Sequence, residues 1–312
     1  MKVSVCMITY NHEKFIAQAI ESVMMQEAGF GYELVIGEDC STDRTREICI
    51  DYQRRFPNRI RLLLPEKNLG MMHNFVQTLN VCTGQYVALL EGDDYWTTPH
   101  KLQKQADFLD AHSDYALCFA RTVTLDEGRG HEPYYLPPPH RQKDTYTVED
   151  LLQGNMIGTC AVMLRNGLVD SFPDWYFQSR VGDWPLYIMA AQHGKVGYIH
   201  ELMATYRIHA KGVHSSQSRL EIFLLSVDIY KAIDAHLGFE YRTLIGQRLA
   251  LTYQLIFAEY LSKRDCANAY HYAIESIKTM RNLPLKVLFA APLAEVDSLV
   301  KRLRDRKITS EI

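Results

Sequence analysis

Residues 86–96 read YVALLEGDDYW, in which an apolar run is followed by Glu91, Gly92, Asp93 and Asp94. A short apolar run bounded by turn residues predicts a buried β-strand, so these acids stand where the strand ends. Neighbouring carboxylates disfavour each other's ionised form unless a cation or a hydrogen-bond donor compensates. The stretch therefore has two interpretations: an ordinary turn, in which Gly and Asp are favoured residues, or a site for a divalent cation.

Similar apolar runs alternate with helical patterns on both sides of this stretch. Strands are predicted at residues 3–8, 32–37, 59–64, 86–90, 115–124, 160–165 and 195–208. Helices are predicted at residues 14–26, 45–56, 71–82, 148–154 and 182–192, with one more beginning near Pro99. This alternation indicates an α/β fold, a mostly parallel sheet with flanking helices.

Two regions depart from the alternation. Residues 126–144 are charged and proline-rich, which predicts a long surface loop. From about Gln217 onward the pattern is entirely helical. We therefore predict a sheet-containing domain over residues 1–216 and a helical C-terminal region over residues 217–312, used for packing, dimerisation or membrane contact. The basic stretch 300–307 would suit an anionic lipid surface or a solvated helix end.

The composition narrows the class of protein. Lys+Arg number 34 and Asp+Glu number 37, a net charge of −3 that argues against a nucleic-acid partner. The seven cysteines include no CxxC pair, which favours reduced thiols in a cytoplasmic protein. The first residues lack a signal-peptide pattern. The late apolar run at residues 283–296 is shorter than the roughly 20 residues that a membrane span needs.

Polar residues follow three of the predicted strands, at 9–11, 38–43 and 91–94. Because ligands bind at the carboxyl ends of the strands in open parallel sheets, these clusters predict a ligand site. The sequence has neither GxGxxG after the first strand nor GxxxxGK[ST], so a cation held by carboxylates is the expected phosphate-binding device. Successive side chains of an extended segment point to opposite sides. Asp93 and Asp94 are therefore expected to do different work, one meeting a sugar hydroxyl and the other the cation.

Asp39 stands at a strand-to-helix junction, where an aspartate is often only a helix cap. Ser41, Thr42 and Asp43 are alternative caps, which leaves Asp39 available for a ligand. A free carboxylate there suits the imide N–H of a uracil ring. Cytosine lacks that proton and would leave the carboxylate unpaired.

Five stretches in this order resemble the motifs of glycosyltransferase family 2, which has the GT-A fold, a Rossmann-like α/β architecture. They are VSVCMITYN at 3–11, ELVIGEDCSTDRT at 33–45, YVALLEGDDYW at 86–96, GDWPLY at 182–187 and YRIHAKGVHSS at 206–216. The resemblance implies an inverting, metal-dependent transfer of a sugar, using Mn²⁺ or Mg²⁺. The expected donor is a nucleoside-diphosphate sugar, preferably UDP-linked. The expected acceptor is a glycan or lipid-linked hydroxyl in polysaccharide or glycolipid synthesis.

The resemblance also implies roles for individual residues. Asp183 matches the catalytic base, and Asp94 with His209 matches the metal site. The residues that match nucleotide-binding positions are Thr9, Tyr10, Asn11, Asp39 and Asp93. The loop after His209 supplies Lys211, His214 and Ser215, which we expect to close over the diphosphate.

Three positions depart from the family pattern: Glu38 stands for the usual Asp, Cys40 for Gly, and Gly182 for an acidic residue before the base. Asp183 has an alternative role as a helix cap, and His209 as a structural histidine. A non-catalytic sugar-nucleotide-binding subunit, regulatory or scaffolding, is the alternative function. A nucleotidyltransferase would need a glycine-rich basic loop after the first strand, where this chain has TYNHEKF.

Overall fold

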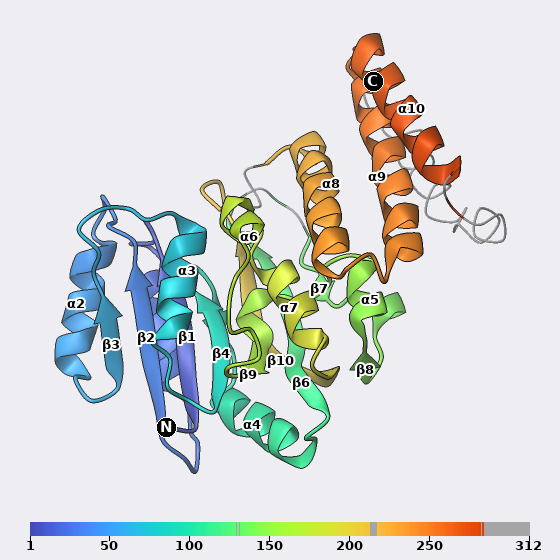
Figure 1. The fold of residues 1–312 in the computed structure, drawn as a ribbon. Helices are drawn as coiled ribbons and strands as arrows, with labels where there is room; N and C mark the ends of the chain where they lie inside the picture. Colours follow the sequence, from blue (N-terminus) through green and yellow to red (C-terminus); the bar gives the residue numbers. More distant parts are fainter. Residues whose placement is uncertain (129, 131, 213–216, 282, 284–312) are drawn as a thin grey trace. The chain divides into compact units, whose positions relative to one another are not determined.

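The computed structural model describes residues 1–128, 130, 132–212, 217–281 and 283. The chain divides into two compact units, Met1–Gln217 and Ser218–Ile312, which are described separately. The first is an α/β unit, and the described part of the second, up to residue 283, is helical (Figure 1). The predicted fold class is confirmed.

The strands of the first unit form one ten-stranded sheet within the described residues. Its main path runs β3-β2-β1-β4-β9-β6-β10-β5, while β7 pairs with β6 and β8 with β10. The strands are β1 (Val3–Thr9), β2 (Tyr32–Glu38), β3 (Ile60–Leu63), β4 (Tyr86–Glu91), β5 (Tyr95–Trp96), β6 (Tyr115–Asp126), β7 (Tyr135–Leu136), β8 (Thr145–Tyr146), β9 (Val162–Arg165) and β10 (Lys195–Ile208). The short β7 and a 3-10 turn, η1 (Pro139–Arg141), lie inside the predicted loop 126–144.

The sheet is mixed. Strands β3, β2, β1 and β4 are parallel, and β10 is parallel to β6. β9 runs antiparallel between β4 and β6, so β4, β6 and β10 all point the same way. The carboxyl ends of β1, β2, β4 and β10 therefore meet at one edge of the sheet, where the predicted polar clusters lie.

Helices cover both faces of the sheet (Figure 1). On one face, alternate residues of β1 (Val3, Val5 and Met7) pack with α1, α2 and α4, as the two-residue period of a strand requires. On the other face, α3, α6 and α7 share a second apolar cluster that includes Tyr176. The helices of this unit are α1 (Ile16–Met24), α2 (Thr45–Arg55), α3 (Met71–Asn80), α4 (Lys101–Ala111), α5 (Val148–Leu152), α6 (Asp174–Gln178) and α7 (Asp183–Ala191), with a 3-10 turn η2 (Thr159–Ala161).

The second unit contains α8 (Arg219–His236), α9 (Arg242–Ser262) and α10 (Cys266–Arg281). Ser218 begins α8 with a capping box, because its hydroxyl accepts from the Glu221 amide and the Glu221 carboxylate accepts from the Ser218 amide. Val227, Tyr253 and Ile256 form the core between the helices.

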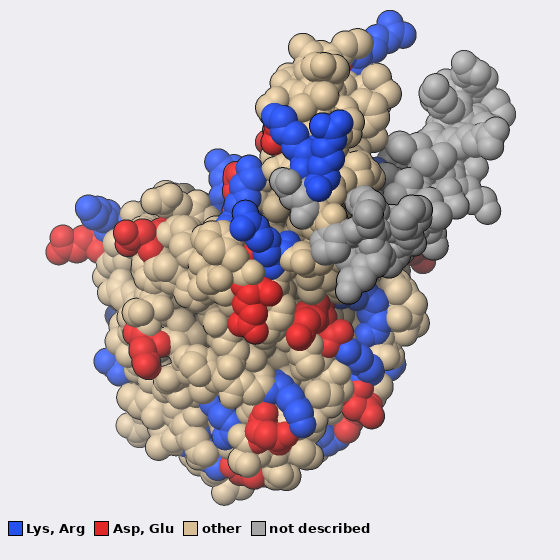
Figure 2. Space-filling model, turned by 45° about the vertical axis from the view of Figure 1, so that its right-hand side comes forward, with Lys and Arg blue, Asp and Glu red and all other residues tan. Residues whose placement is uncertain are grey.

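In the part of the chain that the structure describes, no helix combines the length and the apolar character needed to cross a bilayer. The basic stretch 300–307 lies outside the described residues. Acidic and basic side chains both occur across the described surface in Figure 2. Charged residues that could bind a ligand are therefore expected at one place, the edge of the sheet where the polar clusters lie.

Candidate active site

The acids after β4 form a tight turn against the end of β1. The Asp94 amide donates to the Glu91 carbonyl at 3.1 Å, and the Gly92 amide donates to the Ile8 carbonyl at 2.9 Å. A Cβ atom at Gly92 would lie 2.5 Å from the Thr9 hydroxyl oxygen. No side chain fits there, so glycine lets the acidic turn approach β1.

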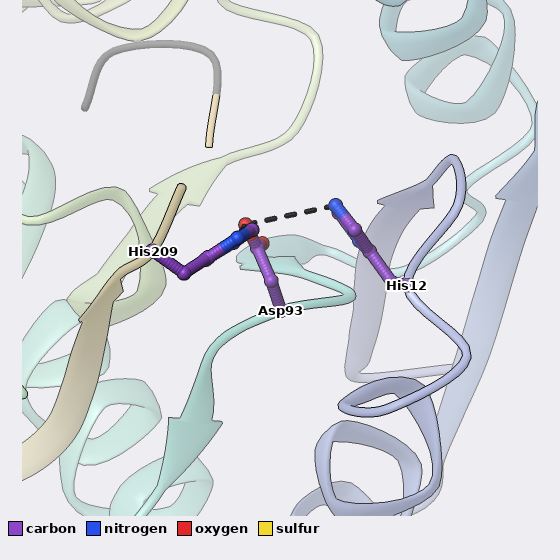
Figure 3. Close-up of side chains that lie close together, drawn as sticks. All are labelled: His12, Asp93 and His209. Atoms are coloured by element: carbon purple, nitrogen blue, oxygen red, sulfur yellow. Dashed lines mark hydrogen bonds and ion pairs between the residues drawn. The ribbon is translucent and has the colours of Figure 1, made fainter. Parts of the chain in front are cut away.

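Asp93 lies between two histidines (Figure 3). Its Oδ2 atom is 3.0 Å from Nε2 of His209, at the end of β10, and 3.6 Å from Nε2 of His12, in the loop after β1. One donor atom from each of these three residues lies within 4.8 Å of the other two. Two imidazoles and a carboxylate are a donor set that transition-metal ions accept.

The charges of this cluster are strongly coupled. Burial raises the pKa of Asp93, but His12 and then His209 outweigh it, so that the net pKa is lowered. The pKa of His12 is lowered by burial first and by His209, against the opposing effect of Asp93. A histidine whose pKa is lowered is held towards its neutral form, which is the form that binds metals.

Sequence reasoning missed His12. Its Nδ1 atom lies 3.2 Å from the Thr9 hydroxyl, and its backbone N–H donates to the Thr45 hydroxyl at 2.8 Å. These contacts hold the ring so that Nε2 faces Asp93. The available signal was position, since His12 directly follows the polar cluster 9–11.

The structure places Asp93, and not the Asp94 that the resemblance pairs with His209, beside that histidine; the metal role of Asp94 stays a prediction. The Oδ1 atom of Asp94 accepts the backbone N–H of Arg207 at 2.8 Å, and Asp94 is only 1% exposed. The reason is the register of β5, whose Tyr95 pairs with Thr205 of β10. That pairing brings Asp94 against the β10 backbone and leaves Asp93 to face the His209 side chain.

Two carboxylate oxygens of the acidic turn are poorly satisfied, although the Cys160 thiol interacts with Asp94 and lowers its pKa in part. Glu91 Oε2 and Asp94 Oδ2 are buried without a hydrogen bond of normal geometry to any described residue. Burial and then Asp93 raise the pKa of Asp94 well above its usual value. Burial, then Asp94, Asp93 and Asp183, raise the pKa of Glu91. A cation placed here would favour the ionised forms of these groups.

Arg207 is a second residue that sequence reasoning missed. Its guanidinium donates to the Asp93 carbonyl oxygen and to the Gln18 side chain. It also lies over the Tyr95 ring, 4.5 Å from the ring centroid. Arg207 therefore ties the acidic turn to α1 and to β5. Its position two residues before His209 on β10 was the available signal, because such residues share a face.

Asp183 is the first residue of α7, and no side chain caps that helix. Its Oδ2 atom accepts hydrogen bonds from Asn155 Nδ2 at 2.8 Å and from the Thr159 hydroxyl at 3.2 Å. The helix-cap alternative is therefore not what the geometry shows. Asp183 is also within electrostatic reach of Glu91.

The surroundings of Gly182 leave little room for a side chain. A Cβ atom there would lie 2.9 Å from the Met72 Cε atom and 3.2 Å from the Tyr176 hydroxyl. Tyr176 is fully buried, and its hydroxyl donates to the Gly182 carbonyl at 3.0 Å. The tyrosine thus occupies the space beside Gly182 and holds the start of α7.

Tyr206, which was also missed, lies within electrostatic reach of four carboxylates of the site. Burial raises its pKa well above the usual value, and four carboxylates add to the effect, in the order Asp94, Asp93, Glu91 and Asp183. The acidic turn and the start of α7 therefore share one electrostatic environment.

The remaining predicted residues at this end of β1 are Thr9, Tyr10 and Asn11. Asn11 has a left-handed backbone with a φ of 57°, and its Oδ1 accepts from the Thr42 amide at 2.8 Å. The backbone N–H of Asn11 donates to the Ser41 hydroxyl. Thr9 is buried beside His12, whereas Tyr10 is 42% exposed. Asn11 therefore fixes the loop after β2.

Asp39 is 2% exposed, and both of its carboxylate oxygens accept backbone amides. The Leu69 amide lies at 2.7 Å and the Gly70 amide at 3.0 Å. The carboxylate is therefore not free, although each oxygen keeps a further lone pair. The neighbouring Glu38 is fully buried and forms an ion pair with Arg46.

The predicted diphosphate loop is described only in part. Lys211 is exposed. His214 and Ser215 lie outside the described residues. Their role stays a prediction.

Comparison with known proteins identifies relatives. The family model described as Glycosyl transferase family 2 matches residues 4–172. The uncharacterized protein Rv1520 of Mycobacterium tuberculosis is 36% identical over 215 residues, which are 68% of this chain and 60% of Rv1520. This chain thus spans less than two thirds of the length of that relative.

Two solved structures share the fold. S. aureus TarS 1-349 in complex with UDP-GlcNAc has a TM-score of 0.58 at 19% identity, covering 89% of this chain and 92% of that one. The mannosyltransferase PcManGT from Pyrobaculum calidifontis, in complex with GDP-Man and Mn²⁺, has a TM-score of 0.58 at 15% identity, covering 99% and 83%. The predicted GT-A fold is confirmed.

Proposed function

Because the chain belongs to glycosyl transferase family 2, we propose that it transfers a sugar from a nucleoside-diphosphate donor to an acceptor hydroxyl, with inversion at the anomeric carbon. One observation carries the proposal. Asp93 lies 3.0 Å from His209 and 3.6 Å from His12, at the edge of the sheet where the strand ends meet. Asp183, a carboxylate with one oxygen bonded to side chains, lies within electrostatic reach of Glu91 in the same acidic turn as Asp93.

Asp93 and His209 fit a divalent cation, which we propose to be Mn²⁺ or Mg²⁺. A carboxylate and an imidazole are suitable donors, and the buried carboxyl groups of Glu91 and Asp94 in the same turn would ionise more readily beside a cation. Such an ion would neutralise charge developing on the departing diphosphate. The complex of PcManGT with GDP-Man and Mn²⁺ supports a metal ion for this fold.

Asp183 is the proposed general base. Inversion requires the acceptor oxygen to attack from the side opposite the diphosphate and to lose a proton as it bonds. Asn155 and Thr159 both donate to Oδ2 of Asp183, which orients the carboxylate. Oδ1 is then the proposed atom that accepts the proton. A positioned base of this kind typically contributes about 10²–10⁴-fold to the rate.

A UDP-linked sugar is the proposed donor, with Asp39 reading the uracil ring. The complexes of TarS with UDP-GlcNAc and of PcManGT with GDP-Man show that this fold accepts either nucleotide, so the preference for UDP rests on Asp39. The proposed acceptor is a glycan or a lipid-linked saccharide. All seven cysteines lie in the described part of the chain and are free, which supports a reducing, cytoplasmic setting.

A panel of UDP- and GDP-sugars with Mn²⁺, with release of the nucleoside diphosphate as the readout, tests the proposal. We expect turnover with one donor and a fall of about 10²–10⁴-fold in kcat for Asp183→Asn, with donor affinity kept. Asp174→Asn is the matched control, because Asp174 is an exposed acid at the start of another helix. If the protein binds a donor tightly but turns it over with none of the acceptors tested, the alternative function, a non-catalytic binding subunit, would be favoured. A product that retains the anomeric configuration would exclude the single displacement.

A further inference from the structure

His12 stands beside Asp93 and His209, and we infer that it is a third protein ligand of the cation. The ion would then bind to the free protein, before the nucleotide sugar. The inference rests on the proposed function, in which Asp93 and His209 hold the ion. It adds a residue from the loop after β1 and an order of binding.

The distances suit three ligands. His209 and His12 place their Nε2 atoms 3.0 Å and 3.6 Å from Oδ2 of Asp93, and all three donors lie within 4.8 Å of one another. An ion with bonds of about 2.1 Å to nitrogen and oxygen places adjacent ligands roughly 3 Å apart and opposite ligands roughly 4 Å apart. Small movements of the side chains would admit such an ion. Figure 3 shows the three side chains converging from separate segments.

The His12 ring is held as metal-binding histidines usually are. A ligating histidine normally donates its second ring N–H to a fixed acceptor, which sets the tautomer. The Thr9 hydroxyl lies 3.2 Å from Nδ1 of His12 and can be that acceptor. The backbone of His12 is fixed as well, through the Thr45 hydroxyl. Nε2 is thereby left with its lone pair towards Asp93.

An independent observation points to a cation at this place. Asp94 is 1% exposed, and its Oδ2 has no hydrogen bond of normal geometry among the described residues. Glu91 Oε2 is in the same condition. Buried carboxylate oxygens normally have partners, so these two poorly satisfied acids favour a cation bound by Asp93 in the same turn.

Three protein ligands have two consequences. The ion needs no diphosphate oxygen to complete a stable site, so nucleotide-free binding is expected. Two of the ligands are nitrogen atoms, which Co²⁺ and Zn²⁺ accept more readily than Mn²⁺ does, and which Mg²⁺ accepts least. His12 therefore also sets the preference among metals.

The test is a titration of the nucleotide-free protein with Mn²⁺, followed by the loss of the electron paramagnetic resonance signal of the free ion. We expect one site per chain, poorly displaced by a tenfold excess of Mg²⁺. His12→Gln should weaken Mn²⁺ binding by about tenfold or more. His193→Ala is the matched control, since His193 is exposed and lies just before β10, at the end opposite His209.

Two further variants keep the test decisive. Thr9→Val leaves His12 in place but removes the hydroxyl at Nδ1, and should weaken Mn²⁺ binding by about tenfold, even if His12→Gln folds poorly. Asp93→Ala separates the two proposals. If Asp93→Ala abolishes Mn²⁺ binding and His12→Gln does not alter it, only the role of His12 is overturned. If neither variant alters it, the cation site of the proposed function fails as well.

An effect of His12→Gln on UDP affinity alone, with Mn²⁺ binding unchanged, would make His12 a contact of the diphosphate and would overturn the inference. So would an absence of Mn²⁺ binding to the parent protein until UDP is added. Co²⁺ provides a second readout, because its visible absorption changes when an imidazole ligand is lost.

Discussion

The Oδ1 atom of Asp94 accepts the backbone N–H of Arg207 at 2.8 Å, while the preceding residue, Asp93, faces His209 at 3.0 Å. The two adjacent aspartates thus point into different surroundings. One supports the β10 backbone and the other meets the side chains of the candidate metal site. Substitutions at the two positions should therefore have different effects.

Asp94→Ala is expected to destabilise the protein by about 1–3 kcal/mol, because it leaves the buried Arg207 N–H without its acceptor. Asp94→Asn keeps an acceptor oxygen at the same place and removes a buried charge. It should therefore lower the free energy of unfolding by less than Asp94→Ala does. Urea unfolding of both variants measures the difference. Asp94→Asn should also retain Mn²⁺ binding, whereas Asp93→Ala should lose it. If Asp94→Asn and Asp93→Ala lose Mn²⁺ binding equally, Asp94 is a metal ligand as the sequence predicted.

Asp39 makes a different prediction, concerning the nucleobase. Its carboxylate is fixed by the amides of Leu69 and Gly70, and its remaining lone pairs are proposed to accept the uracil imide. The parent protein should bind UDP more tightly than CDP in the presence of Mn²⁺. Asp39→Asn, which presents an N–H₂ group in place of one oxygen, should bring the two affinities together. Calorimetry with both nucleotides measures this.

The control experiment measures the stability of the Asp39→Asn variant. If Asp39→Asn weakens UDP and CDP by the same factor and also lowers the unfolding midpoint, Asp39 anchors only the segment 68–70. Parent protein that binds CDP as well as UDP would remove the imide argument altogether.

Most of the fold could be predicted from the sequence, because β1, β2 and β4 are apolar runs buried on both faces of the sheet. The short strands β5 and β7 could not, since two-residue strands have no periodicity and are defined only by their partners. The antiparallel direction of β9 between β4 and β6 could not be predicted from the sequence either. Antiparallel and parallel neighbours need the same kind of apolar residue.

The candidate site was predictable as a set of strand ends but not as a set of contacts. Whether Asp93 or Asp94 meets His209 depends on the register of β5 against β10. The approach of His12 follows the left-handed turn at Asn11, a conformation that asparagine tolerates better than most residues. No pattern in the sequence specifies either feature.

Asn155 and Thr159 should act as positioning residues for Asp183. Both donate to Oδ2, so removing either donor should let the carboxylate rotate away from the acceptor. Thr159→Val is expected to lower kcat by about tenfold, the equivalent of one hydrogen bond, with the KM for the donor unchanged. Thr159→Ser keeps the hydroxyl and should restore the parent rate. A rise in KM without a change in kcat would show that Thr159 contacts the donor instead.

Lys101, on α4, is fully buried and should make stability depend on pH. Its Nζ donates to Gln105 at 2.7 Å and lies 4.2 Å from the Trp96 ring centroid. Burial lowers its pKa from 10.5 to about 7. Between these values the unfolded chain binds more protons at this site than the folded chain. Stability should therefore rise with pH from about 7 upward, by roughly 1 kcal/mol per pH unit from this group.

Lys101→Met removes the titrating group and keeps most of the volume. Below pH 7 the parent protein carries the full cost of a buried charge, so the variant should gain most stability there, and the gain should shrink by pH 8.5. Urea unfolding of the two proteins between pH 6 and 8.5 measures the difference, in which titrations shared by both cancel. Lys104→Met is the control, because Lys104 lies on the same helix with its side chain 42% exposed. A constant difference between parent and Lys101→Met over this range would mean that Lys101 keeps its proton, held by the Trp96 ring and Gln105.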